Sequence, residues 1–84
     1  MELEIIKFFG KACGQCKAQE GILKVIIEER PDVKVTKMDV AEHPDLVEKY
    51  NISSLPTMLV MKNGELVEKL VGLKPKVIIM KHLS

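Results

Sequence analysis

The sequence predicts an α/β fold with a four-stranded mixed sheet, helices on both of its faces and the element order βαβαββα. Two observations lead to this prediction. Within residues 3–40 a strand pattern, a helix pattern and a second strand pattern follow one another, which is the order of a strand–helix–strand unit with parallel strands. Further along the chain, an Asn-Gly pair separates two more strand patterns, and Asn-Gly is the strongest short signal for an antiparallel hairpin. The 84 residues are expected to form a single domain, residues 1–84, with one core and no linker.

The first strand is expected over residues 3–9, because branched and aromatic residues dominate this run and Gly10 ends it. Its composition suits a central strand that is buried on most of both faces. A helix is expected from Gly14 to a stop at Pro31-Asp32. The apolar residues that recur there at helical spacing are Ala18, Ile22, Val25 and Ile26, with Leu23 and Ile27 beside them. Residues 33–40 alternate well enough for a second strand.

The second half of the chain predicts a short helix, a hairpin and a last helix. The short helix is expected over residues 45–50, with Asn51 at its end. Its inward residues are Leu46, Val47 and Tyr50. Strands are expected over residues 57–61 and 65–71, on either side of the Asn63-Gly64 turn, where both residues tolerate positive φ. Gly72 ends the hairpin, and Pro75 can open a last helix with apolar residues up to Leu83.

Composition excludes several classes of function. Lysine and arginine number 13 against 12 aspartates and glutamates, so the net charge of +1 creates no overall attraction to nucleic acid or to an anionic membrane. The longest apolar stretches are far below the roughly 20 residues that a membrane-spanning helix needs. The first residues, Met-Glu-Leu-Glu, lack the features of a secretory signal. We therefore expect a soluble, cytoplasmic monomer that binds neither nucleic acid nor membrane.

The chemistry is expected at Cys13-Gly14-Gln15-Cys16, where the first strand leads into the first helix. Residues i and i+3 of a helix have Cα atoms about 5 Å apart, within the range of roughly 4.4–6.8 Å that a disulfide accepts. Unpaired N–H groups and the positive end of the helix dipole favour the thiolate of Cys13. The pattern predicts reversible thiol–disulfide exchange in which Cys13 attacks a substrate disulfide and Cys16, less exposed, resolves the mixed disulfide.

The cysteine pair has two alternative interpretations, a zinc site and a structural bridge. A Cys-x-x-Cys pair can be half of a zinc site, but His43 and His82 do not have the paired spacing of further zinc ligands. As a structural bridge the pair would be weak, because closing a loop of about four residues stabilises a fold by only roughly 2 kcal/mol. We therefore expect no metal and no cofactor. A redox-inert adaptor, or a module that binds metal through the two cysteines, is the alternative function.

Four segments together resemble the thioredoxin superfamily over essentially the whole chain. They are Phe8 to Lys17 (FFGKACGQCK), Ile52 to Thr57 (ISSLPT), Lys62 to Glu65 (KNGE) and Gly72. The resemblance implies a thioredoxin-like fold, protein-disulfide oxidoreductase activity and a cis Leu55–Pro56 bond beside the cysteines, where an ordinary turn would have a trans bond. In this family the proline loop pairs its backbone with the substrate peptide. The substrate-binding residues that the resemblance implies are Ala12, Gly14, Gln15, Leu55, Pro56, Thr57 and Gly72.

The resemblance also implies partners: disulfide-containing client proteins, and a flavin-linked or glutathione-linked reductase. Ala12 and Gln15 stand where the typical thioredoxin signature has tryptophan and proline. The chain begins at the strand that leads to the motif, so its size is closer to glutaredoxin or to the short thioredoxins of some archaea and bacteria. No basic cluster that demands glutathione is recognisable in the sequence. Relatives with this motif include reductases and oxidases, so both directions of electron flow stay open.

Lys7 is a further departure, because thioredoxins carry a buried aspartate at this position that moves a proton to or from the resolving cysteine. Leu3, Ile5, Lys7 and Phe9 alternate onto one apolar face of the first strand, where an unpaired charge is costly. In one interpretation the lysine stem packs and the ammonium reaches solvent near Asp39. In the other, Lys7 lies behind Cys16 and favours its thiolate or accepts its proton, which would make Lys7 a third catalytic residue.

Overall fold

The computed structural model describes residues 1–84, and its elements follow the expected order. They are β1 (Leu3–Phe9), α1 (Gly14–Glu29), β2 (Val33–Asp39), α2 (Pro44–Lys49), β3 (Thr57–Lys62), β4 (Glu65–Val71) and α3 (Lys76–Lys81). Only element ends differ from the prediction. Helix α2 begins at Pro44, one residue earlier than expected, because the fixed φ of proline suits the first helical position. No helix is both long and apolar enough to cross a lipid bilayer.

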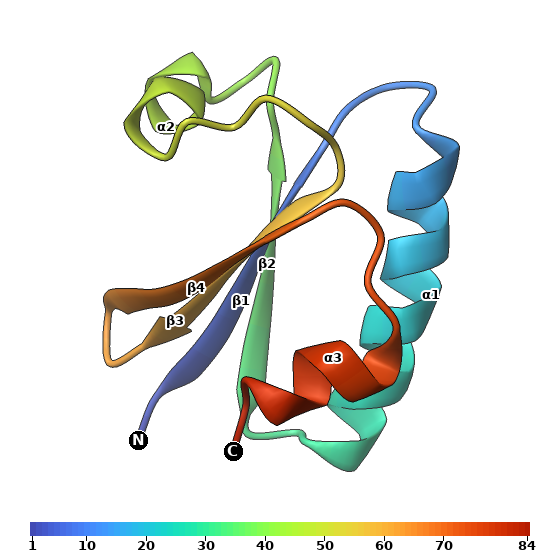
Figure 1. Ribbon diagram of the computed structural model, residues 1–84, viewed down its shortest axis with the longest axis vertical. Helices are drawn as coiled ribbons and strands as arrows, with labels where there is room; N and C mark the ends of the chain where they lie inside the picture. The colour runs from blue at the N-terminus through green and yellow to red at the C-terminus, as the bar shows by residue number, and fades with distance from the viewer.

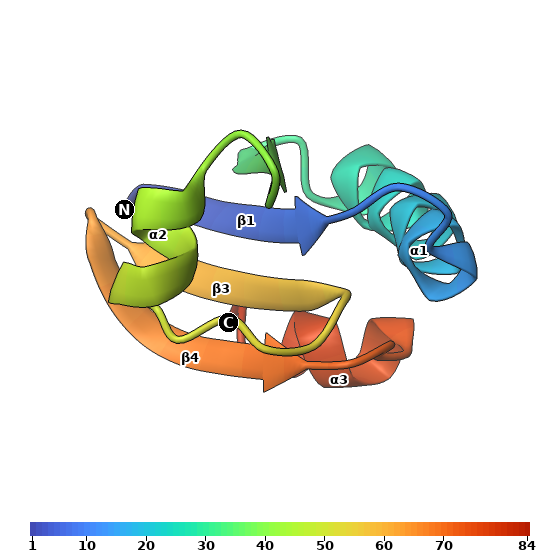
Figure 2. The ribbon, with the colours of Figure 1, turned by 90° about the horizontal axis from the view of Figure 1, so that it is seen from above.

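The four strands form one mixed sheet in the order β2-β1-β3-β4. Strand β1 pairs in parallel with β2 and antiparallel with β3, and β3 pairs antiparallel with β4. Helices α1 and α3 cover one face of the sheet and α2 lies over the other (Figures 1 and 2). The prediction of a four-stranded mixed sheet with helices on both faces is confirmed. Because β1 is a central strand, its end delivers the cysteine motif to the middle of the sheet edge rather than to a corner.

Two apolar cores lie on the two faces of the sheet. The larger core joins α1 and α3 to the sheet, and the smaller one lies under α2. Alternate residues of β3 enter the two cores, with Met58 and Val60 in the first and Leu59 and Met61 in the second. All four are at most 8% exposed, so β3 is buried on both faces and anchors the loop that precedes it.

The buried face of α1 differs from the predicted stripe. Cys16, Gln19, Leu23 and Ile26 are its buried residues, whereas Val25 and Ile27, which were expected inward, are 45% and 37% exposed. The spacing of the buried residues follows the helical repeat once Gln19 is counted among them. The sequence pattern placed the face wrongly because it counted only apolar residues.

The Asn63-Gly64 turn forms as predicted. Asn63 and Gly64 have φ values of 50° and 82°, both in the left-handed region. The side-chain oxygen of Asn63 also accepts a hydrogen bond from the Glu2 amide at 2.9 Å, and the Asn63 amide donates to the Glu2 carbonyl at 2.8 Å. The turn therefore holds the start of β1 as well as joining β3 to β4.

Candidate active site

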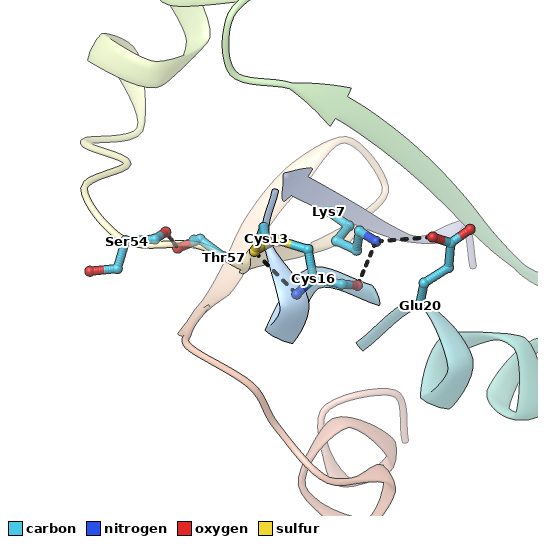
Figure 3. The surroundings of a disulfide bond; sticks show 6 residues. All are labelled: Lys7, Cys13, Cys16, Glu20, Ser54 and Thr57. Carbon is cyan, nitrogen blue, oxygen red and sulfur yellow. Dashed lines mark hydrogen bonds and ion pairs between the residues drawn. A yellow bond between two sulfur atoms is a disulfide. The ribbon is translucent and has the colours of Figure 1, made fainter. Parts of the chain in front are cut away.

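Cys13 and Cys16 form a disulfide at the start of α1 (Figure 3). Their Cα atoms are 5.2 Å apart, as expected for positions i and i+3 at a helix start. Cys13 is half-buried, whereas Cys16 is only 4% exposed. The two sulfurs are therefore unequal: an incoming group can reach Cys13 more easily than Cys16.

The sulfur of Cys13 lies at the amino end of the helix. Cys13 is the N-cap residue of α1, and the backbone N–H of Cys16 donates a hydrogen bond to its Sγ at 3.2 Å. The first turn contains no acidic residue. Because the amino end of a helix carries partial positive charge, this position favours a negatively charged sulfur at Cys13.

Lys7 reaches the same place from β1. Its side chain is 2% exposed, and its Nζ donates a hydrogen bond to the carbonyl oxygen of Cys16 at 3.1 Å. The ammonium also lies 5.6 Å from the centre of the Phe9 ring. The ammonium makes no hydrogen bond or ion pair with Asp39, and its acidic neighbour is Glu20 instead. The ammonium is thus directed behind Cys16 instead of into solvent.

Glu20 is a site residue that the sequence analysis missed. Its carboxylate lies between two lysines: one oxygen is 3.8 Å from the Lys7 Nζ and the other accepts a hydrogen bond from Lys37. Lys7 and Lys37 are directly paired in the register of β1 and β2. The signal was present in the spacing, because Glu20 follows Cys16 by one helical turn and therefore shares its face.

Burial and neighbouring charges act on this cluster in different directions. Burial lowers the pKa of Lys7, Glu20 raises it and Lys37 lowers it again, with burial the largest of these effects. The pKa of Glu20 is lowered, first by the hydrogen bond from Lys37 and then by the charges of Lys37 and Lys7. Glu20 is therefore a carboxylate at neutral pH, and it is the one acidic group that opposes the effect of burial on Lys7.

The loop before β3 lies on the other side of the disulfide from Lys7 and Glu20 (Figure 3). The Leu55–Pro56 peptide bond is cis, the geometry that the resemblance implies. The Thr57 side chain is fully buried, and its hydroxyl donates to the Ser54 carbonyl at 2.6 Å. The whole residue is 0% exposed, and Thr57 is paired with β1 and β4 in the sheet, so neither its side chain nor its backbone is open to a client in this structure.

Gly72 is held against this loop. Its amide donates to the Pro56 carbonyl at 2.8 Å, and its φ of 84° is a conformation that glycine adopts without strain. The remaining residues that were expected to bind substrate, Ala12, Gly14 and Gln15, are exposed around Cys13. Ala12 has a φ of 56°, which is unusual for a residue with a Cβ atom.

Gln19 fixes the segment that follows Gly72. The side chain is fully buried, its Nε2 donates to the Lys74 carbonyl at 3.0 Å, and its Oε1 accepts from the Lys74 amide at 2.8 Å. One amide group thus satisfies both backbone groups of Lys74. Gln19 could not be recognised from the sequence, because a lone glutamine on a helix gives no indication of its partner.

The two cysteines have no further metal ligands around them. No group of three or more histidine, cysteine, aspartate or glutamate side chains is arranged to hold a metal ion.

Comparisons with known proteins agree with this chemistry. The family model described as Thioredoxin matches residues 1–84. The chain is 39% identical over 82 residues to a thioredoxin of Chlamydia trachomatis, covering 98% of this chain and 80% of that protein. It is 43% identical over 70 residues to a thioredoxin of Bacillus subtilis, covering 82% of this chain and 67% of that protein.

Solved structures give the same result. Oxidised mitochondrial thioredoxin 3 of Saccharomyces cerevisiae superposes with a TM-score of 0.88 at 30% identity, covering 98% of this chain and 77% of that one. Oxidised thioredoxin of Plasmodium falciparum superposes with a TM-score of 0.83 at 33% identity, covering 98% and 79%. These likenesses extend over nearly the whole chain, which belongs to the thioredoxin family and is a thiol–disulfide oxidoreductase with Cys13 and Cys16 as its redox pair.

Proposed function

We propose that the protein reduces disulfides in client proteins, with Cys13 as the attacking sulfur and Cys16 as the resolving sulfur. The observation that carries this assignment is the inequality of the two cysteines. Cys13 is the more exposed one, and its sulfur accepts the Cys16 N–H at the positive end of α1. Cys16 is 4% exposed, so a client sulfur reaches it poorly.

Each turnover transfers two electrons from the cysteine pair to the client. The Cys13 thiolate attacks one sulfur of the client disulfide, forms a mixed disulfide and releases the other client sulfur as a thiolate, which takes up a proton. The Cys16 thiolate then attacks the Cys13 sulfur. The mixed disulfide breaks, the Cys13–Cys16 disulfide forms, and the second client sulfur leaves and is protonated.

The client is proposed to lie along the loop before β3. Ser54 is exposed and Leu55 is half-buried, whereas Pro56 and Thr57 are buried, so the part of the loop before Pro56 suits main-chain pairing with an extended client segment. Ala12, Gly14 and Gln15 would surround the reacting sulfur. Pro56 and Gly72 are proposed to hold the loop in shape, since the Gly72 amide already occupies the Pro56 carbonyl.

Lys7 is proposed to act on Cys16. The ammonium lies at the Cys16 carbonyl, so its positive charge favours the Cys16 thiolate that forms when the disulfide opens. Lys7→Met should then move the pH dependence of Cys16 alkylation to higher pH, measured in the Cys13→Ser background. An unchanged profile would reject this role and leave Lys7 as a packed side chain.

We propose that residues 1–84 work as one domain and as a monomer in the cytoplasm, re-reduced by a flavin-linked or a glutathione-linked reductase. The direction of electron flow can be read from the reduction potential of the Cys13–Cys16 pair. A client reductase should have a potential near the value of about −270 mV that thioredoxin has, and an oxidase one near about −120 mV.

The test of the proposed function is a trapping experiment. Cys16→Ser should form a stable mixed disulfide with insulin, visible by non-reducing electrophoresis and removed by dithiothreitol, whereas Cys13→Ser should form none. The wild type should reduce insulin catalytically. If the wild type fails to reduce insulin and Cys16→Ser traps no complex, the chain is a redox-inert adaptor and the proposal is wrong.

A further inference from the structure

A pocket of about 330 Å³ opens beside the disulfide, between β1, α1 and β2. Both cysteines line it. The charged residues that line it are Lys7, Lys11, Lys17, Lys37 and Glu20. They come from three elements and one loop, so only the folded chain brings them together. The pocket lies on the Lys7 and Glu20 side of the disulfide, opposite the Ser54 and Thr57 side where the client is proposed to bind (Figure 3).

The pocket is much more positive than the molecule as a whole. Its four lysines and single carboxylate leave an excess of three positive charges, whereas the whole chain has a net charge of only +1. The carboxylate of Glu20 is already shared by Lys7 and Lys37. Lys11 and Lys17 are exposed, and neither takes part in an ion pair. Two unpaired ammonium groups therefore stand at the rim of a hollow that ends at the reactive sulfurs.

We propose that this pocket binds the carboxylate of a low-molecular-weight disulfide and thereby directs its sulfur to Cys13. The inference rests on the proposed function, because the same two cysteines carry the exchange. The pocket is at the small end of the range of roughly 300–1,000 Å³ that small-molecule sites occupy. Its positive charge favours anionic ligands over neutral and cationic ones of the same size.

The chemistry balances with the cysteine pair as the reductant. The Cys13 thiolate attacks one sulfur of the small disulfide and forms a mixed disulfide, and the other half of the small disulfide leaves as a thiolate that takes up a proton. Cys16 then attacks Cys13, releases the second thiol and closes the protein disulfide. Two electrons pass from the cysteine pair to one molecule of small disulfide. The reverse reaction, with two molecules of the small thiol, reduces the protein.

The experiment compares three small disulfides that differ in charge: dithiodipropionate, hydroxyethyl disulfide and cystamine, which are anionic, neutral and cationic. The value of kcat/KM is measured for each with the reduced protein at low ionic strength. Each value is divided by the rate constant of the same disulfide with dithiothreitol, which corrects for intrinsic reactivity. We expect the corrected kcat/KM to be highest for the anionic disulfide, lower for the neutral one and lowest for the cationic one. These differences should disappear in high salt, because exposed charges are then screened.

Substitutions of the charged residues in the pocket test whether they cause the preference for the anionic disulfide. Lys11→Met and Lys17→Met should each lower the ratio of anionic to neutral kcat/KM by about two- to fivefold, the size of an exposed ion-pair effect. Glu20→Gln should raise this ratio, because it frees Lys7 and Lys37. Lys34→Met and Glu28→Gln are matched controls outside the pocket, and both should leave the ratio unchanged. The neutral disulfide serves as an internal control for changes in the cysteine chemistry itself.

Binding can be measured without reaction. Thiodipropionate, a dicarboxylate with a thioether in place of the disulfide, should shift the backbone amide resonances of Lys7, Cys16, Glu20 and Lys37 in the oxidised protein. The backbone amide resonances of Ser54, Leu55 and Thr57 should not move. Shifts confined to residues 54–57, or no saturable shift at all, would reject the pocket as the anion site.

The failure of this inference differs from the failure of the proposed function. The protein could reduce insulin and hydroxyethyl disulfide and yet show no lysine-dependent preference for the anionic disulfide. That result would support the proposed function and reject the pocket as an anion site. An equal loss of preference in Lys17→Met and in the Lys34→Met control would also overturn the inference, since the effect would then belong to the general surface charge. Inactivity towards insulin and all three small disulfides would reject both.

Discussion

Lys7 places a positive charge on the buried face of β1, at 3.1 Å from the Cys16 carbonyl and 3.8 Å from Glu20. The alternation of β1 predicted the face on which Lys7 lies, and the structure agrees. Its partners could not be predicted in this way. Glu20 belongs to a different element, and the alternation pattern describes only the strand itself. The packing of α1 against the sheet therefore decided between the two interpretations of Lys7.

The buried ammonium predicts how stability depends on pH. Burial lowers the pKa of Lys7 below 10.5, so the folded chain loses this proton at a lower pH than the unfolded chain. Between those two pKa values the unfolded chain binds more protons, and the free energy of unfolding therefore rises with pH. Below the folded pKa both states are charged, and the cost of burying the charge is at its largest.

Urea unfolding of the oxidised wild type and of Lys7→Met, from neutral pH to about pH 10.5, measures this effect. The stability of the wild type relative to Lys7→Met should increase over the alkaline part of the range, because the unfolded chain keeps the Lys7 proton to higher pH than the folded chain does. Lys34→Met, which removes an exposed lysine, is the matched control. A difference between the wild type and Lys7→Met that stays constant over the whole pH range would contradict the effect of burial on Lys7.

At the scale of single elements, α1 combines packing and site formation. Its buried positions include Cys16 and Gln19, so the helix contributes the resolving cysteine and also the amide that binds Lys74. Apolar spacing predicted that the helix exists and where it starts. It misplaced the buried face, since a polar residue with a backbone partner can be buried as completely as leucine.

Gln19→Leu should destabilise the protein by about 1–3 kcal/mol, because it leaves the amide and carbonyl of Lys74 without partners. Amide hydrogen exchange at residues 72–74 should become faster, since the segment loses its attachment to α1. Gln15→Leu, at an exposed position of the same helix, is the control and should change stability by less than about 0.5 kcal/mol. Equal stability of the two variants would contradict this role of Gln19.

Replacement by alanine should have opposite effects on stability at two glycines of the chain. Gly21 lies within α1 and Gly64 in the hairpin turn, and a Cβ atom would meet open space at both positions. Gly64 has a φ of 82°, whereas Gly21 lies in an ordinary helix. Gly21→Ala should stabilise by about 0.5–1 kcal/mol, because alanine has the better helix propensity. Gly64→Ala should destabilise by about 1 kcal/mol or more, because its Cβ opposes the left-handed conformation.

Urea denaturation of the two alanine variants side by side measures both effects, with the wild type as reference. A stabilising Gly64→Ala would mean that the turn leaves the left-handed region in solution. Destabilisation by Gly21→Ala would mean that the helix surface at that position is covered.

At the scale of the whole molecule, the disulfide is not part of the apolar cores that stabilise the fold. The two apolar cores contain ten and four buried residues, and neither includes Cys13 or Cys16. The bridge closes only a short loop, three positions apart in sequence. Folding and redox chemistry can therefore proceed independently, as a protein that opens and closes its disulfide in every cycle requires.

Reduction should leave the chain folded. The far-ultraviolet circular dichroism should be retained, and the free energy of unfolding should fall by no more than about 2 kcal/mol, the chain-entropy effect of so short a loop. Urea denaturation with and without dithiothreitol measures the difference. The double variant Cys13→Ser/Cys16→Ser should show no response to dithiothreitol. An unfolded reduced chain would contradict this independence of fold and bridge.

The sequence by itself determined the fold class, the element order and the chemistry of the cysteine pair. Each depends on patterns within a short stretch of chain: alternation for strands, apolar spacing for helices, Asn-Gly for the hairpin, and two cysteines at a helix start. Local patterns of this kind leave a signal that a single sequence can show.

Only the tertiary structure decided which side chains surround the disulfide. Lys7, Glu20 and Lys37 come from β1, α1 and β2, and they meet because those elements pack in one particular register. The contact of Gln19 with Lys74 spans 55 positions in the same way. Such contacts depend on the relative placement of whole elements, and that placement is set by core packing over the entire chain rather than by any segment of it.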